Sequence, residues 1–206
     1  MRNGKLPALC VKVWGEYACF TRPEMKVERV SYPVMTPSAA RGVLKAIFWK
    51  PEFEWQVREI HVLRPIRHIS LMRNEVSKRM SLSGGPFFAD EARAQRHTLA
   101  LRDVAYLIYA DIVLKDHADK DVAAYRDQFR RRVARGECYF QPYLGCREFT
   151  AYFSAPTGNE QPISLSDDLG RMLGEIRFRN GKAEPVFFHA YLRQGILHVP
   201  EGIYGR

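Results

Sequence analysis

Alternation of apolar and polar residues predicts several β-strands along the chain. The clearest is residues 103–115, "DVAYLIYADIVLK", where every second residue from Val104 to Leu114 is apolar. Such alternation places the apolar side chains on one face of a strand. Residues 9–20, "LCVKVWGEYACF", and residues 53–65, "FEWQVREIHVLRP", show the same tendency, and a proline ends the second segment. We therefore expect three strands in these positions.

Two other segments have the periodicity of amphipathic helices. Thr36 and Pro37 suit the N-cap and the first helical position, where a missing N–H costs nothing. A second helix is expected at about residues 120–135, and Gly136 provides its stop. Each helix has an apolar stripe on one side. The stripe residues are Ala40, Val43, Leu44, Ile47 and Phe48 in the first helix, and Val122, Tyr125, Phe129 and Val133 in the second.

The order of these elements predicts an α+β fold. With a further strand at residues 147–156, "REFTAYFSAP", the order is β-α-β-β-α-β. This order is typical of the split βαβ or ferredoxin-like fold, as in RRM domains, with two helices on one sheet face and the other face open. The polar segment 66–102 is too long for a plain loop, so we expect a hairpin insertion there.

The C-terminal part predicts a small antiparallel β-sheet. Three strand-like pieces, "GRMLGEIRFR", "EPVFFHAYLR" and "GILHVP", are separated by Asn-Gly and Gln-Gly turn signals. We therefore divide the chain into a ferredoxin-like domain at residues 1–156 and an appended sheet at residues 157–206.

The net charge of the chain indicates which kind of partner it binds. Among 206 residues, 32 are Lys or Arg and 23 are Asp or Glu, which gives a formal net charge of +9. With a pI near 9.5, this balance favours a polyanionic partner. Nucleic acid is the leading candidate, and an anionic membrane surface is the second.

Other classes of function find little support in the sequence. No apolar run is long enough to span a bilayer, and the first residues do not resemble a secretory signal, so we expect a cytoplasmic protein without membrane contact. The four cysteines have no zinc-ligand spacing, and no motif for a P-loop, a serine hydrolase or paired metal ions is present. We expect no metal and no cofactor.

The basic residues form several clusters that could bind phosphates. Arg and Lys contact phosphates without regard to base, and nearby aromatic rings can stack on unpaired bases. For any one cluster, a solvated charged face is the simpler interpretation; together with the pI, the clusters favour nucleic-acid binding. The clusters contain Arg22, Lys26 and Arg29; Arg41 and Lys45; Arg67, Arg73, Lys78 and Arg79; and Arg126, Arg130, Arg131, Arg132 and Arg135.

A catalytic site without metal is possible if the substrate is RNA. The RNA 2′-hydroxyl can attack the adjacent phosphate when a general base takes its proton and a cation stabilises the developing charge. Tyr109, Asp111 and Lys115 share one face of the predicted strand 103–115 and could serve this chemistry. An ordinary amphipathic strand edge is the simpler alternative.

Several segments resemble the Dvulg subtype, type I-C branch, of the fifth CRISPR-associated (Cas) family of RAMP proteins. The resemblance runs in order from about residue 10 to residue 154. The segments are "VKVWGEYACFTRPEMKVERVSYPVMTPSAARGVLKAIFWKP", "IHVLRPI", "RNEVSKRM", "TLALRDVAYLIYADIVL" and "YLGCREF".

This resemblance implies a ferredoxin-like domain, a small C-terminal sheet and a function. In type I-C systems it implies an endoribonuclease that cuts the repeat hairpin of precursor CRISPR RNA without metal. The enzyme then keeps the 5′ handle of the mature CRISPR RNA as a subunit of the Cascade complex. The helix that begins near Thr36 would lie beside the RNA, with its last turn near the scissile phosphate.

The sequence departs from the family pattern at the positions where catalysis is expected. Some members have Tyr or His where Phe48 stands, His is frequent where Asp111 stands, and Lys occurs in some at Tyr109. Phe48 cannot exchange a proton. The catalytic candidates are therefore Tyr109, Asp111, Lys115 and the nearby His117.

A glycine-containing loop completes the set of candidate RNA contacts. The segment "LGCREF", with Gly145 and Arg147, resembles the loop of the family that lies near bound RNA. The simpler interpretation is a turn before the last predicted strand. Two alternatives for the whole chain also stay open: a non-catalytic RNA-binding scaffold of Cascade, and general binding of double-stranded DNA.

Overall fold

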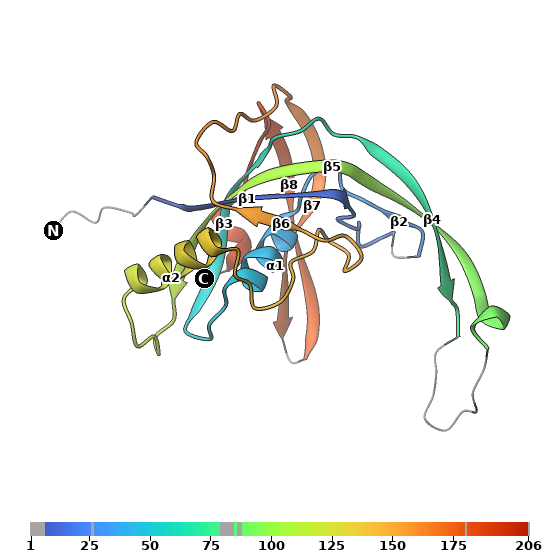
Figure 1. Ribbon diagram of the computed structural model, residues 1–206, viewed down its shortest axis with the longest axis horizontal. Coiled ribbons are helices and arrows are strands. Elements are labelled where there is room, and N and C mark those ends of the chain that lie inside the picture. Colours follow the sequence, from blue (N-terminus) through green and yellow to red (C-terminus); the bar gives the residue numbers. More distant parts are fainter. Residues whose placement is uncertain (1–6, 26, 79–84, 86–87, 180, 206) are drawn as a thin grey trace.

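The computed structural model describes residues 7–25, 27–78, 85, 88–179 and 181–205. Its centre is a long, curled antiparallel β-sheet, with helices α1 (Pro37–Ile47) and α2 (Val122–Arg135) on one face (Figure 1). Neither α1 nor α2 covers the other face of the central strands, in agreement with the predicted α+β class.

Within the described residues, nine strands form one sheet. Its main path runs β6 (Tyr152–Ser154), β1 (Leu9–Ala18), β5 (Arg93–Leu114), β3 (Phe53–Val62), β9 (Ile196–His198), β8 (Lys182–Arg193) and β7 (Asp167–Arg179). Two strands branch from β5: β2 (Arg29–Val30) pairs with it in parallel and β4 (His68–Val76) antiparallel. All pairs along the main path are antiparallel.

One end of each helix is formed as expected from the sequence. The Thr36 hydroxyl accepts a hydrogen bond from the Ala39 N–H at 3.2 Å, which confirms the N-cap of α1. Helix α2 ends at Gly136 in the left-handed region, with φ +67°. Its first residue is Val122 rather than Lys120, because Asp121 occupies the N-cap position.

The core lies between the helices and the sheet. Apolar side chains of β1, β3 and β5 are buried there against the stripes of both helices; for example, the Trp55 ring meets Phe129 with centroids 4.8 Å apart. On β5, Val104 to Ile112 alternate inward as expected, and Ile108 and Ala110 are fully buried. This packing fixes which β5 side chains point to the open face.

The polar segment 66–102 contains the expected hairpin. Strand β4 pairs antiparallel with the first half of β5 from His68–Leu101 to Val76–Arg93, and a short 3-10 turn, η1 (Ala89–Ala92), precedes β5. The hairpin projects away from the helices at the right of Figure 1. Strand β5 is longer than predicted, because it continues through Asp103, which has φ +54°.

Two expectations differ from the structure. The predicted strand 147–156 is limited to β6, because residues 143–150 form a loop whose own hydrogen bonds replace sheet pairing: the Leu144 N–H donates to the Phe149 carbonyl at 2.7 Å. The C-terminal strands are antiparallel as expected, but β9 pairs with β3, so they continue the main sheet. The domain division at residue 156 stays a prediction.

A final turn, η2 (Glu201–Tyr204), packs beside β3, where the Tyr204 hydroxyl accepts a hydrogen bond from the Val57 N–H at 3.0 Å. No helix in the described part of the chain is long and apolar enough to cross a membrane.

Candidate nucleic-acid interface

A charged pocket lies where α1, β7 and the edge of β3 meet. Its volume is about 550 Å³, and its lining includes Arg41, Lys45, Glu54 and Glu175. Arg41 and Lys45 come from successive turns of α1, as their i, i+4 spacing requires. Arg41 forms an ion pair with Glu175, whose side chain is only 4% exposed. We call this the α1 pocket.

Lys115 extends the α1 pocket along the end of β5. Its ammonium is 3.5 Å from the Glu54 carboxylate, and its backbone N–H donates to the Glu52 carbonyl at 2.9 Å. His117 lies two residues further along, in an exposed turn. The α1 pocket and the end of β5 therefore bring together three of the predicted cations, Arg41, Lys45 and Lys115.

This cluster contains more cations than carboxylates. Burial and the neighbouring charges shift the pKa values of Lys45 and Glu175. Burial, followed by repulsion from Arg41, lowers the pKa of the Lys45 ammonium. Burial also raises the pKa of the Glu175 carboxyl, against the opposing effect of Arg41. A phosphate near Arg41, Lys45 and Lys115 would relieve the repulsion between like charges.

Tyr109 and Asp111 lie on the open face of the sheet, where each already has partners. The Asp111 carboxylate accepts a hydrogen bond from Arg58 Nε at 2.6 Å, and Arg58 also pairs with Glu201. The Tyr109 ring lies against His61, with centroids 4.5 Å apart. Burial and neighbouring Cys10 raise the pKa of Tyr109 to about 12, so its hydroxyl keeps its proton at neutral pH.

Sequence patterns did not single out Arg58 or His61, although both shape this part of the face. His61 Nε2 lies 2.9 Å from one Glu59 oxygen, and His198 Nδ1 lies 3.3 Å from the other. These contacts depend on the β-bulge between Val57 and Glu59, which no local sequence signal marked. Among the described residues, no group of His, Cys, Asp or Glu side chains is arranged to hold a metal ion.

The glycine loop, residues 143–150, packs tightly against the end of β1. The Cys19 N–H donates to the Leu144 carbonyl at 3.0 Å. Gly145 has φ +85°, and a Cβ there would collide with the backbone carbonyl of Cys19. Glycine is therefore required at this position by both conformation and space. Arg147 is exposed on the same loop.

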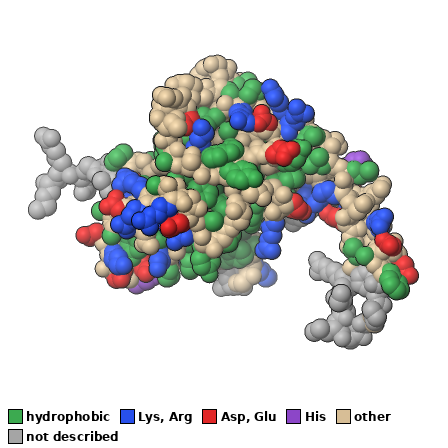
Figure 2. Space-filling model, viewed as in Figure 1, with side chains coloured by type: hydrophobic (Ala, Val, Ile, Leu, Met, Phe, Trp, Pro, Cys, Tyr) green, Lys and Arg blue, Asp and Glu red, His purple; other side chains and the backbone are tan. Residues whose placement is uncertain are grey.

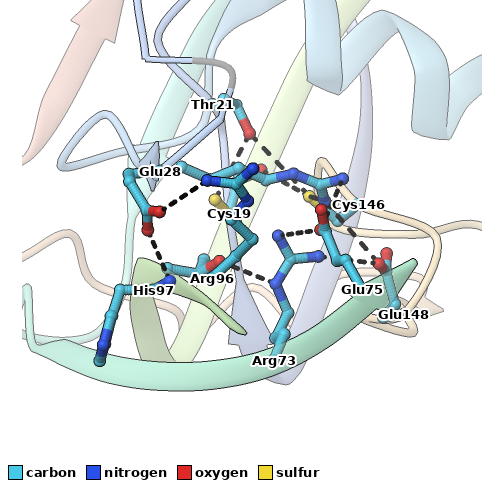
Figure 3. A network of polar contacts seen from close by, with 11 residues as sticks. Cys19, Thr21, Glu28, Arg73, Glu75, Arg96, His97, Cys146 and Glu148 are labelled. Atoms are coloured by element: carbon cyan, nitrogen blue, oxygen red, sulfur yellow. Dashed lines mark hydrogen bonds and ion pairs between the residues drawn. The ribbon is translucent and has the colours of Figure 1, made fainter. Parts of the chain in front are cut away.

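An ion-pair network joins the glycine loop to β2 and β4 (Figure 3). Arg73 of β4 lies 2.8 Å from Glu75 and 3.4 Å from Glu148, and its Nε donates to the buried Thr98 hydroxyl at 2.9 Å. Arg29 contacts the same two carboxylates at 4.0 and 3.7 Å. We call these four charged residues the β4 network.

A sulfur atom adds to the β4 network. Arg29 Nη1 donates to Cys146 Sγ at 3.2 Å; the neighbouring Cys19 thiol first, and then this guanidinium, lower the pKa of the Cys146 thiol. Cys19 is its buried neighbour, and both cysteines are free thiols.

The remaining predicted RNA contacts are spread over the surface. Arg22 lies over the Tyr32 ring, 4.5 Å from its centroid, and Lys78 follows β4. Lys26 and Arg79 lie outside the described residues.

Basic side chains also gather over α2, where Figure 2 shows several side chains in the colour of Lys and Arg close together. The helix exposes Arg130, Arg131 and Arg135. Arg132 instead donates from Nε to the Ile47 carbonyl at the end of α1, at 2.9 Å. At least one arginine of this cluster therefore has a structural role.

Comparison with known proteins gives two relatives of nearly the same length. The chain is 53% identical over 210 aligned residues to "CRISPR pre-crRNA endoribonuclease Cas5d" of Thermus thermophilus, with 93% of this chain and 91% of the relative covered. It is 44% identical to the protein of the same name from Mannheimia succiniciproducens, with 91% and 92% covered.

Solved structures with the same fold are more distant in sequence. A crystal structure described as a CRISPR-associated protein aligns with TM-score 0.70 at 22% identity, covering 93% of this chain and 90% of the other. A functionally uncharacterized protein from Streptococcus mutans aligns with TM-score 0.68 at 18% identity, covering 93% and 91%. The family model described as "CRISPR-associated protein (Cas_Cas5)" matches residues 8–199. With most of its length matched and two relatives above 40% identity, the chain belongs to this CRISPR-associated family.

Proposed function

We propose that this protein is an endoribonuclease that cleaves precursor CRISPR RNA in its repeat hairpin and stays bound to the 5′ handle as a Cascade subunit. The main support is the 53% identity, over 93% of the chain, to a relative named as a pre-crRNA endoribonuclease. The charge of +9 suits such a ligand. Because the precursor RNA is a cytoplasmic transcript, we place the protein in the cytoplasm.

In the proposed reaction, the nucleophile is the 2′-hydroxyl of the RNA itself. A base takes the proton of the 2′-hydroxyl, and the 2′-oxygen bonds to the adjacent phosphorus. The bond from phosphorus to the 5′-oxygen then breaks, and that oxygen takes up a proton. The products are a 2′,3′-cyclic phosphate and a 5′-hydroxyl. No metal is required, because cations of the protein stabilise the extra charge on the phosphate.

Of the four catalytic candidates, Lys115 and His117 are the better placed. Histidine is the side-chain type best suited to proton transfer near neutral pH. His117 is exposed and lies two residues after Lys115. Lys115 contacts Glu54 of the cation-rich α1 pocket. Tyr109 has a raised pKa and Asp111 is held by Arg58, so neither is prepared to act as a base. We assign phosphate binding to Arg41 and Lys45.

A second proposal, which rests on the fold, concerns the place where the 5′ handle of the RNA binds. The order β6-β1-β5-β3, with α1 between β1 and β3 and α2 between β5 and β6, is the strand order of a ferredoxin-like domain. In this arrangement the glycine loop and the hairpin of β4 and β5 lie at the end of the sheet where β1 ends. We propose that this end holds the 5′ handle, with Arg22, Arg147 and Lys78 as candidate contacts.

A non-catalytic scaffold subunit is the alternative function. It is favoured by one observation: Phe48 is buried against Phe53, with ring centroids 5.3 Å apart, and offers no proton to the reaction. Double-stranded DNA binding could accompany either function, since the exposed arginines of α2 form a cationic surface.

Incubation of the purified protein with its cognate repeat RNA in EDTA separates these two functions. The endoribonuclease proposal expects one defined cut in EDTA at the same rate as with Mg²⁺. Tight binding without any cut, with or without Mg²⁺, would establish the scaffold instead.

A further inference from the structure

A second pocket lies on the open face of the sheet, away from α1 and α2. Its volume is about 400 Å³, which is in the range of small-ligand sites. Strand β1 supplies Lys12 and Trp14, which alternate with the buried Val11 and Val13. The segment 157–161 covers one side of the pocket. None of the residues assigned above to RNA cleavage lines it.

Trp14 gives this pocket its one aromatic lining residue in the described part of the chain. Tyr152 of the neighbouring strand β6 lies outside this lining, and its ring stacks with Trp14, with centroids 6.1 Å apart and an angle of 28° between the planes. Tyr152 is 56% exposed although it is large and mostly apolar. The Trp14 ring on the open sheet face makes a platform on which a flat ring can stack.

The charges at the rim are already neutralised. Lys12 Nζ lies 3.2 Å from Glu160, and Arg64 pairs with Asp103. Backbone N–H groups of the 157–160 turn hold the pKa of the Glu160 carboxyl at about 2, so it stays ionised beside Lys12. A phosphate would therefore meet as many carboxylates as cations here, and the pocket is not an anion site.

Uncharged polar groups face the pocket from the covering segment. Asn159 and Gln161 both line it, and neither side-chain amide makes a hydrogen bond to another residue in the described ranges. Amide side chains offer paired donors and acceptors that match the edges of nucleobases. The platform can hold the face of such a ring while the amides meet its edge.

We propose that this pocket binds one nucleobase, stacked on Trp14 and read at its edge by Asn159 and Gln161. The base can belong to an unpaired nucleotide of a bound strand or to a free nucleotide. The site is separate from the cleavage site, and it adds a contact for single-stranded nucleic acid on the face opposite the helices.

The test measures binding of a short single-stranded RNA without a hairpin, by fluorescence anisotropy at low and at high salt. Trp14→Ala should weaken binding about tenfold, since stacking contributes roughly 1–3 kcal/mol per base. Asn159→Ala combined with Gln161→Ala should weaken binding several-fold and leaves the platform intact. Tyr139→Ala is the matched control, because it removes an aromatic ring that is 80% exposed elsewhere.

The salt dependence gives the sharpest outcome. The loss caused by Trp14→Ala should be the same at both salt concentrations, because stacking involves no counterion release. Unchanged affinity in both pocket variants, or a loss that disappears at high salt, would overturn the proposal.

Competition by a nucleoside monophosphate separates the two sources of the base. If it displaces the RNA from wild type but not from Trp14→Ala, free nucleotides also occupy the pocket. If it has no effect while Trp14→Ala still weakens RNA binding, the site takes a base only within a strand. A chain that does not cleave repeat RNA would refute the proposed function but would leave these binding results unaffected.

Discussion

The α1 pocket and the β4 network are both rich in cations, but their charges are arranged in opposite ways. In the β4 network, Arg29 and Arg73 share Glu75 and Glu148, so two cations meet two carboxylates. In the α1 pocket, which Arg177 also lines, and at the adjoining Lys115, four cations meet only two carboxylates, and the pKa of Lys45 is lowered. The charges of the β4 network therefore balance, whereas the α1 pocket and Lys115 together carry an excess of positive charge.

This difference separates cations that hold the fold from cations that can hold a ligand. Arg73 connects β4 to the glycine loop and is 18% exposed, so its removal would leave two carboxylates with Arg29 as their shared cation in the β4 network. Arg41 and Lys45 are crowded by each other, which an incoming phosphate would relieve. The carboxylates that lie near an arginine in the folded protein therefore determine its role. The clustering of basic residues along the sequence does not show which role an arginine has.

The largest expected effect is on cleavage. The double variant Lys115→Ala, His117→Ala should lower the single-turnover cleavage rate at least about 100-fold, since proton transfer contributes roughly 10²–10⁴-fold. Repeat affinity should remain within a few-fold of wild type. The matched pair Tyr109→Phe, Asp111→Asn should cleave at more than a tenth of the wild-type rate. Loss of activity in the second pair alone would move the site to the open face.

A smaller effect is expected on binding through the α1 pocket. Arg41→Ala combined with Lys45→Ala should weaken repeat binding about tenfold and reduce the slope of log affinity against log salt by about 2. Cleavage by the bound complex should also slow. Equal affinity and an unchanged salt slope would show that the excess charge of the α1 pocket does not contact RNA. Arg130→Ala combined with Arg131→Ala removes two exposed cations of α2 and serves as the control for net charge.

For the β4 network, stability should change more than binding. Arg73→Ala should lower the melting temperature by about 5 °C, because it leaves Glu75 and Glu148 with only the longer Arg29 contacts in the β4 network and a buried Thr98 hydroxyl without its donor. The measurement is thermal unfolding followed by circular dichroism. A normal melting temperature with strongly reduced repeat affinity would mean that Arg73 is an RNA contact, as the sequence first indicated.

The smallest expected effect is a pH dependence in the α1 pocket. Because burial raises the folded-state pKa of Glu175, its contribution to stability is present below the unfolded pKa and is lost as pH rises through the folded pKa. The melting temperature of wild type relative to Glu175→Gln should therefore fall between pH 4 and pH 7. A difference that stays constant or rises with pH would show that Arg41 outweighs the burial of Glu175.

Elements with local signals could be read from the sequence, whereas contacts across the sheet could not. Thr36 and Gly136 marked helix ends because capping is a property of a few adjacent residues. The partners of Asp111 and Arg73, by contrast, lie 53 and 75 residues away in Arg58 and Glu148. Residues 147–150 have strand-like composition, but loop hydrogen bonds replaced sheet pairing there.

The central claim is that the RNA itself supplies the nucleophile, and one substitution in the substrate tests it directly. We would replace the 2′-hydroxyl at the mapped cleavage position of the repeat RNA with hydrogen and measure binding and cleavage by the wild-type protein in EDTA. The account predicts unchanged affinity, no cleavage of this RNA, and a 2′,3′-cyclic phosphate on the upstream product of the unmodified RNA. Cleavage of the 2′-deoxy RNA at the normal rate would contradict it.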